Sequence, residues 1–134
     1  MITRDEMMAL MLSACPSFQS AWLEFVDEWR AEDEKPLYLA LGSLARHLIA
    51  MLAAQDTAGL TSAFSVIERW HADGDPYVRE AASVGLLENL QNESLHESTS
   101  PKDFEPFLLP QSLKWWRKVE RFWSHAEIIR DDEA

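Results

Sequence analysis

Apolar side chains recur every three or four residues along most of the chain, which is the period of an α-helix with one buried face. The clearest case follows Pro110, where a set of apolar residues falls on such steps: Trp115, Trp116, Val119, Phe122, Trp123, Ala126 and Ile129. No segment alternates apolar and polar residues as a half-buried strand does. The pattern therefore predicts an all-α fold, a compact stack of about seven antiparallel helices.

Prolines and a glycine mark where the predicted helices begin and end. Pro36 suits the first turn of a central helix that we expect over residues 36–55. Gly74 suits the left-handed residue that often ends a helix. Asp75 and Pro76 then provide an N-cap and a first-position proline for the next helix.

The length of 134 residues matches one domain, and no linker-like segment divides the chain. We therefore expect a single helical domain over residues 1–134, with residues 131–134 forming a flexible acidic tail. Apolar residues make up 47% of the chain and charged residues 26%, a mixture that excludes a disordered protein.

Arg46 stands in the middle of the otherwise apolar central helix. An arginine in such a position is rarely buried without a partner, so we expect a largely buried Arg46 paired with a carboxylate. Glu68 and Glu88, on neighbouring helices, are the candidate partners.

The six tryptophans are expected to serve mainly in packing. Trp22, Trp29, Trp116 and Trp123 fall on the predicted core stripes. Adjacent positions on a helix point about 100° apart, so one of Trp115 and Trp116 is expected near the edge of the core.

The single cysteine, Cys15, excludes an internal disulfide and favours a reducing compartment. The acidic start of the chain does not resemble a signal peptide. Arg46 and His47 lie in the middle of the longest apolar stretch, where a central arginine costs about 2.5–3.5 kcal/mol in a membrane. We expect a cytoplasmic protein with no membrane partner.

No constellation with catalytic or metal-binding spacing is present in the sequence. The four histidines, His47, His71, His96 and His125, include no pair four residues apart, and no Gly-x-Ser-x-Gly motif occurs. Helix caps and a glycine stop account for the alternating polar residues 71–75. We therefore expect no enzymatic activity, no cofactor and no metal.

The charge balance is strongly acidic, with 12 basic and 23 acidic residues and a net charge of −11. It argues against nucleic acid as a partner, because such binding neutralises phosphates with basic side chains. An acidic stretch is usually a solvated face, but it can also steer a basic partner. Under the second interpretation, the contact residues are Asp27, Glu28, Glu32, Asp33 and Glu34, with a second acidic turn at Asp73, Asp75 and Tyr77.

Several segments together resemble a family of small, all-helical bacterial proteins of unassigned function. They are LYLALG at 37–42, ARHL at 45–48, FSVIER at 64–69, GDPYVR at 74–79 and VGLLENLQN at 84–92. The resemblance covers about residues 17–125, and such proteins look like the immunity partners of polymorphic and secreted toxins. The segment 75–82 also resembles the start of the second helix in a HEAT-type pair, which predicts a HEAT-like pair in the centre.

The resemblance implies a protein that binds and neutralises one cognate toxin. The acidic charge favours a basic nuclease as that toxin. The competing hypothesis is a non-catalytic helical adaptor that scaffolds another protein. The identity of the toxin, the contact face and the oligomeric state stay open.

Overall fold

The computed structural model describes residues 1–125 and 129, so the predicted acidic tail at 131–134 lies outside the described residues. The described part contains seven α-helices, joined in several places by short 3₁₀ or π-helical segments, and no strand. The α-helices are α1 (Arg4–Ala14), α2 (Gln19–Glu28), α3 (Leu37–Ala53), α4 (Thr57–Asp73), α5 (Pro76–Glu80), α6 (Glu88–Leu90) and α7 (Pro110–His125). The shorter segments are η1 (Pro16–Phe18), η2 (Ala81–Leu87), η3 (Glu93–Leu95) and η4 (Pro101–Phe107). The predicted all-α class is confirmed, while the HEAT-like pair stays a prediction.

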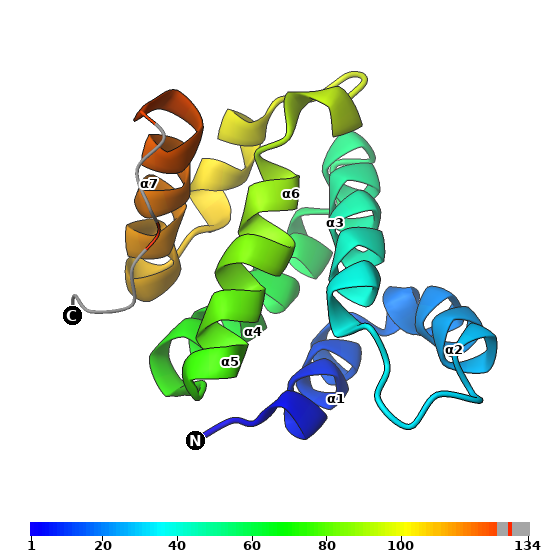
Figure 1. The fold of residues 1–134 in the computed structure, drawn as a ribbon. Helices are drawn as coiled ribbons and strands as arrows, with labels where there is room; N and C mark the ends of the chain where they lie inside the picture. Colours follow the sequence, from blue (N-terminus) through cyan, green and yellow to red (C-terminus); the bar gives the residue numbers. More distant parts are fainter. Residues whose placement is uncertain (126–128, 130–134) are drawn as a thin grey trace.

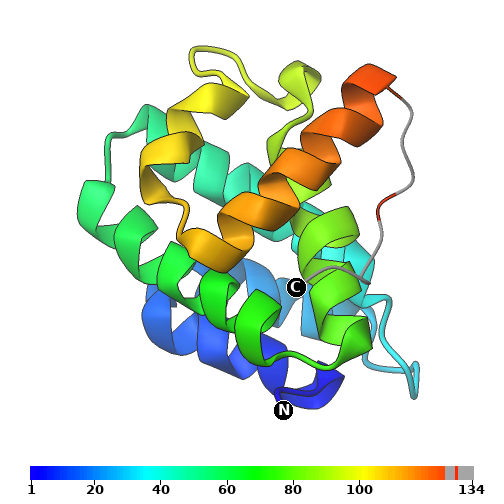
Figure 2. The ribbon, with the colours of Figure 1, turned by 90° about the vertical axis from the view of Figure 1, so that its left-hand side faces the viewer.

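Two long helical rods form the centre of the molecule. The α5, η2 and α6 segments run on as one helix, with a π-helical middle, and this helix lies beside α3 (Figure 1). Helix α1 packs on α4, and α7 runs across the face formed by α4 and η2 (Figure 2). The observed bounds of α3 agree with the central helix predicted over 36–55.

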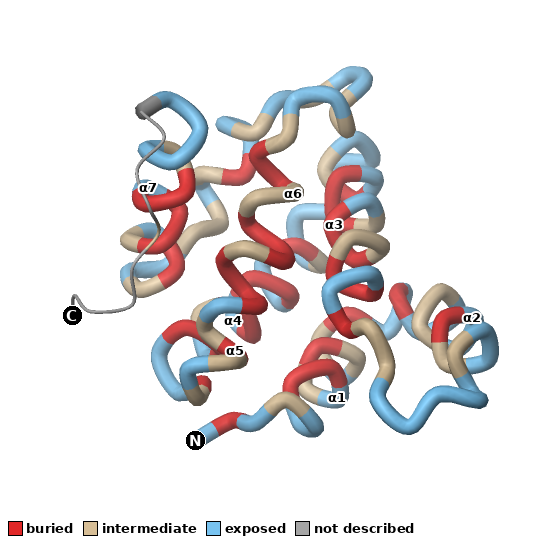
Figure 3. The backbone as a smooth tube through the Cα atoms, viewed as in Figure 1, coloured by how far each residue is buried: buried red, intermediate tan, exposed pale blue. Residues whose placement is uncertain are grey.

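The core lies between these helices, and the buried stretches of the backbone concentrate on the sides of the helices that are turned toward one another (Figure 3). Burial of a large apolar side chain contributes about 1.5–3 kcal/mol, so the core face of α4 is a major source of stability. Trp70 on this face is fully buried, and its indole Nε1 donates to the Met7 carbonyl at 3.1 Å. The residues of this face are all buried: Leu60, Phe64, Ile67, Trp70 and His71.

Arg46 is exposed and forms no ion pair with the described residues, so its predicted burial is wrong. The reason is its angular position on α3. Leu44 and Leu48 are fully buried, and position 46 lies about 200° around the helix from each of them. Arg46 therefore lies on the outward face of α3.

Glu68 and Glu88 do not pair with Arg46. The Glu68 carboxylate accepts hydrogen bonds from the backbone nitrogens of Gln111 (2.9 Å) and Ser112 (2.7 Å) in the first turn of α7. These nitrogens have no partner within their own helix, and the helix dipole also favours a negative charge there. Burial raises the pKa of the half-buried Glu88 carboxyl.

The tryptophans differ from the prediction in two respects. Trp116 is buried, and Trp22 and Trp29 pack half-buried against the core, as expected. Trp123, however, exposes 50% of its surface, because the second half of α7 faces the polar connection between α6 and α7. Trp115 and Trp116 are both buried, so neither lies at the edge of the core.

Gly74 does not take the predicted left-handed conformation, since its φ is −73°. The residue lies where two backbones approach, with Ile2 N donating to the Asp73 carbonyl and Asp75 N donating to the Ile2 carbonyl. A Cβ at Gly74 would collide with the Trp70 carbonyl oxygen and lie 2.6 Å from Val78 Cγ1. The close approach of the two backbones therefore explains the glycine at this position. A left-handed φ, of 59°, occurs at Gln55, which follows α3.

We expect Gly74→Ala to lower the free energy of unfolding by about 1–3 kcal/mol, the usual cost of overpacking. Gly42→Ala is the matched control, because a Cβ there meets only Arg46 Nη1 at 3.9 Å. It should stabilise α3 by about 0.5–1 kcal/mol, the helix preference of alanine over glycine. Urea unfolding measures both changes, and an unchanged midpoint for Gly74→Ala would contradict the close approach.

Candidate functional site

The connection between α2 and α3, residues 29–36, borders a hollow of about 450 Å³. The N-termini of α1 and α3 and the first turn of α5 complete its wall, so segments far apart in the sequence meet there. We call it the acidic–aromatic hollow. Its lining residues are Arg4, Trp29, Glu32, Glu34, Lys35, Pro36, Leu37, Tyr38 and Tyr77.

Arg4 holds the wall of this hollow together. It is the first residue of α1, where the positive end of the helix dipole disfavours a cation unless other groups compensate. Arg4 Nη1 donates to Glu34 Oε1 at 2.7 Å, and Nη2 donates to the Lys35 carbonyl at 2.6 Å. The guanidinium also lies 5.0 Å from the centre of the Tyr77 ring, within cation–π range.

The two tyrosines of the chain form the aromatic side of the hollow. Their rings meet edge to face, with centroids 6.3 Å apart. Burial, together with the charge of Glu80 and the neighbouring Tyr77, raises the pKa of Tyr38 to about 12. Burial also raises the pKa of Tyr77, with the charges of Glu34 and Glu80 adding to it and Arg4 opposing it. Both phenols therefore stay protonated at neutral pH and can donate hydrogen bonds.

A second, smaller hollow of about 370 Å³ borders the same connection and shares Arg4, Glu34, Lys35 and Leu37 with the first. Asp33 and Glu34 line it together with Trp22, whose ring stacks on Phe25 at a centroid distance of 5.4 Å. Both hollows at this connection are therefore lined by carboxylates together with aromatic residues.

The structure brings four of the sequence-predicted contact residues together. Glu32, Glu34 and Tyr77 line the acidic–aromatic hollow, and Asp33 lines the neighbouring one. Tyr77 belongs to the second predicted acidic turn. The fold nevertheless places it in the same hollow as Glu32 and Glu34, which precede it by more than 40 positions in the sequence. Arg4 links the two groups, because its guanidinium contacts both the Glu34 carboxylate and the Tyr77 ring.

The other predicted residues lie elsewhere or have another role. Asp27 is exposed and pairs with Arg30 at 3.0 Å, and Glu28 is exposed, but neither lines a hollow. The Asp75 carboxylate caps α5 by accepting from Val78 N at 2.9 Å, which leaves it less available to a partner.

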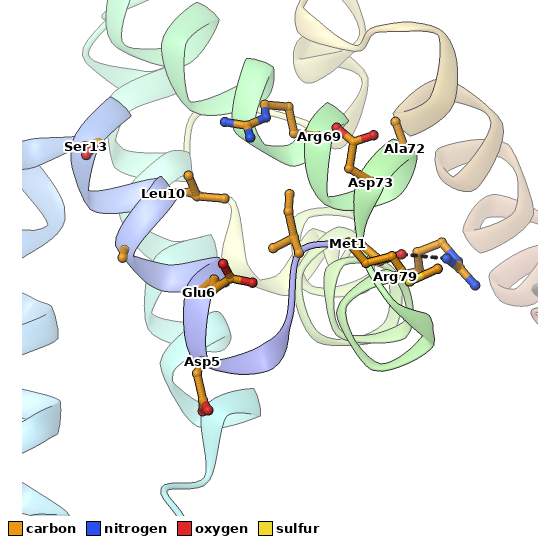
Figure 4. Close-up of a pocket in the computed structure, with 12 residues that line it drawn as sticks. Met1, Asp5, Glu6, Leu10, Ser13, Arg69, Ala72, Asp73 and Arg79 are labelled. Carbon is orange, nitrogen blue, oxygen red and sulfur yellow. Dashed lines mark hydrogen bonds between the residues drawn. The ribbon is translucent and has the colours of Figure 1, made fainter.

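Asp73 lines a separate, open cavity of about 770 Å³ between α1 and the end of α4 (Figure 4). Arg69 and Arg79 line the same cavity, and Arg79 Nη1 donates to the Gly74 carbonyl at 2.6 Å. Asp73 therefore lies among cations as well as acids. This mixed surface is less suited to a basic partner than the α2–α3 connection is.

Sequence reasoning missed three residues that the hollow uses, Arg4, Trp29 and Tyr38, and it assigned Trp29 to packing alone. A basic residue in the first turn of a helix, where the dipole opposes it, was the available signal for Arg4. No comparable signal marks Tyr38, because its place in the sequence is that of any other residue of the apolar central helix.

Among the described side chains of His, Cys, Asp and Glu, no three converge into a potential metal site. Of the described helices, none has both the length and the apolar character that a membrane crossing requires.

The fold and the hollow define an all-α domain with an acidic, aromatic surface at the joint of two helices. The chain belongs to the family described as Domain of unknown function (DUF7674), whose model matches residues 8–124. No curated protein and no solved structure matches the chain significantly. The family description names no activity, so the link to immunity proteins stays a prediction.

Arg4→Met should lower the free energy of unfolding by about 1–2 kcal/mol, because two charge-assisted hydrogen bonds and the Tyr77 contact are lost while the apolar stem is kept. Arg30→Met is the matched control. Its ion pair with Asp27 is largely solvated on both sides, so the loss should stay under about 0.5 kcal/mol. Chemical denaturation tests both variants, and equal losses would show that Arg4 is an ordinary surface arginine.

Proposed function

We propose that the protein binds and neutralises a basic protein toxin through the acidic–aromatic hollow and the acids beside it. The observation that carries this proposal is the way the hollow already holds a guanidinium. Arg4 lies between the Glu34 carboxylate, a backbone carbonyl and the face of Tyr77. A cationic side chain of a partner would be recognised by groups of the same kind.

Glu32 and Asp33 supply the charge for such a partner. Both are exposed, and neither takes part in an ion pair with the described residues. They belong to the short connection that the Arg4 contacts hold in place, so a partner meets them with little further loss of chain entropy. Trp29 and Tyr38 beside them are of the residue types that anchor protein interfaces.

A nuclease is the toxin class that this surface fits best. Proteins that bind nucleic acids carry clusters of lysine and arginine to neutralise phosphates. A net charge of −11 attracts such a surface and accelerates association. The proposal places the encounter in the cytoplasm, where the free thiol of Cys15 stays reduced.

The test takes the protein encoded by the gene beside that of this protein, which the proposal expects to be a basic toxin. We expect the purified protein to inhibit the toxin's activity at one protein per toxin. A helical adaptor would bind a partner without abolishing its activity, so binding without inhibition would favour that alternative.

Reversal of the two exposed acids, in the double variant Glu32→Lys with Asp33→Lys, should slow association with the toxin about tenfold at low salt. It should also flatten the dependence of the association rate on salt. The melting temperature should change little, because Arg4 keeps its partner Glu34, which the variant leaves intact.

The matched control reverses the same number of charges at Glu93 and Glu97, two exposed acids in the connection between α6 and α7. Stopped-flow kinetics at two salt concentrations compare the variants. If both double variants slow association equally, net charge alone sets the rate and the hollow is not the contact surface.

A further inference from the structure

The starts of α1 and α5 are joined by a short backbone bridge. Ile2 N donates to the Asp73 carbonyl at 2.8 Å, and Asp75 N donates to the Ile2 carbonyl at 2.9 Å. Ile2 and Gly74 pair in parallel in this bridge. Each of them immediately precedes the N-cap residue of its helix, so the bridge joins α1 and α5 at equivalent positions.

Further contacts hold both sides of the bridge in place. Ile2 is buried, with only 7% of its surface exposed. Arg79 Nη1 donates to the Gly74 carbonyl at 2.6 Å, on the side of α5 (Figure 4). On the side of α1, Thr3 N donates to Glu6 Oε1 at 2.9 Å and ties the residue after Ile2 to the first turn of the helix. The start of α1 therefore has a defined position relative to the start of α5.

The bridge places Arg4 beside Tyr77. Arg4 follows Ile2 by two positions, and Tyr77 follows Asp75 by two positions. Across the bridge, the Arg4 guanidinium lies 5.0 Å from the centre of the Tyr77 ring. This arrangement needs a constraint, because the positive ends of two helix dipoles meet beside a cation. The backbone bridge supplies that constraint.

We infer that Ile2 is a positioning residue for the acidic–aromatic hollow and acts through Arg4. By fixing the start of α1 on the start of α5, Ile2 holds the guanidinium over Tyr77 and within hydrogen-bond distance of Glu34. Release of Ile2 from the bridge would withdraw Arg4 from the wall of the hollow. The role of Ile2 in toxin binding rests on the proposed function, whereas its role in placing Arg4 does not.

The pKa of Tyr77 reports where Arg4 lies. Burial raises the pKa of this phenol, Arg4 lowers it, and the charges of Glu34 and Glu80 raise it further. Movement of the Arg4 cation away from the ring therefore raises the pKa. General loosening of the fold has the opposite sign, because water then reaches the phenol and the pKa falls toward its ordinary value.

The test titrates the protein with isotope-labelled tyrosine by NMR. The chain has two tyrosines, and Tyr38→Phe identifies the signal of Tyr77. We expect Ile2→Ala and Arg4→Met each to raise the pKa of Tyr77, and Ile2→Val to keep the parental value. The double variant Ile2→Ala with Arg4→Met should have the pKa of Arg4→Met alone, because Ile2 acts through Arg4.

Ile49→Ala is the matched control. Ile49 also exposes 7% of its surface, but it lies on α3 and lines neither hollow at the α2–α3 connection. Its loss of buried apolar surface should leave the pKa of Tyr77 at the parental value. An unchanged or lowered pKa in Ile2→Ala would overturn the inference. Equal shifts in Ile2→Ala and Ile49→Ala would overturn it too, because any loss of packing would then move Arg4.

Binding to the protein encoded by the neighbouring gene separates this inference from the proposed function. Ile2→Ala and Arg4→Met should lose the same amount of affinity, while Ile49→Ala keeps the parental affinity. If the parent does not bind, the proposed function fails, and the titration alone still decides whether Ile2 positions Arg4. Parental affinity in Ile2→Ala, together with a raised pKa of Tyr77, would contradict the role of Ile2 in toxin binding.

Discussion

The guanidinium of Arg4 connects three parts of the chain, because it bonds to Glu34 and the Lys35 carbonyl and lies over Tyr77. The connection between α2 and α3 has few helical hydrogen bonds of its own. Without this contact, little would hold its carboxylates against α1 and α5. The wall of the acidic–aromatic hollow therefore depends on one cation, placed where the dipole of α1 alone would disfavour it.

The three- and four-residue periodicity was enough to predict the all-α class and the span of α3. It was not enough to place Arg46, because exposed apolar residues such as Leu39 share its outward face and hide the polarity of that face. The true role of Glu68 could not be predicted either. Its carboxylate caps α7 by accepting from Gln111 and Ser112, a pairing between positions more than 40 residues apart.

The candidate site was predicted in part. The acidic run identified Glu32, Asp33 and Glu34 from local composition, and the cap at Asp75 followed from the proline after it. The approach of Tyr77 to the α2–α3 connection depends on how α1 and α5 pack, which local patterns do not encode. The same limit applies to Gly74, where the requirement for glycine comes from Trp70 and Val78 and not from a turn.

Hydrogen exchange of the protein with and without the basic toxin domain that we propose as its partner tests the central claim most directly. The account predicts that binding slows the exchange of backbone amides in residues 29–38 and around Tyr77. It also predicts that α7 keeps the exchange rates of the free protein. Protection confined to the exposed end of α7, around Phe122 and Trp123, would contradict the account, because the partner would then bind the aromatic end of the last helix.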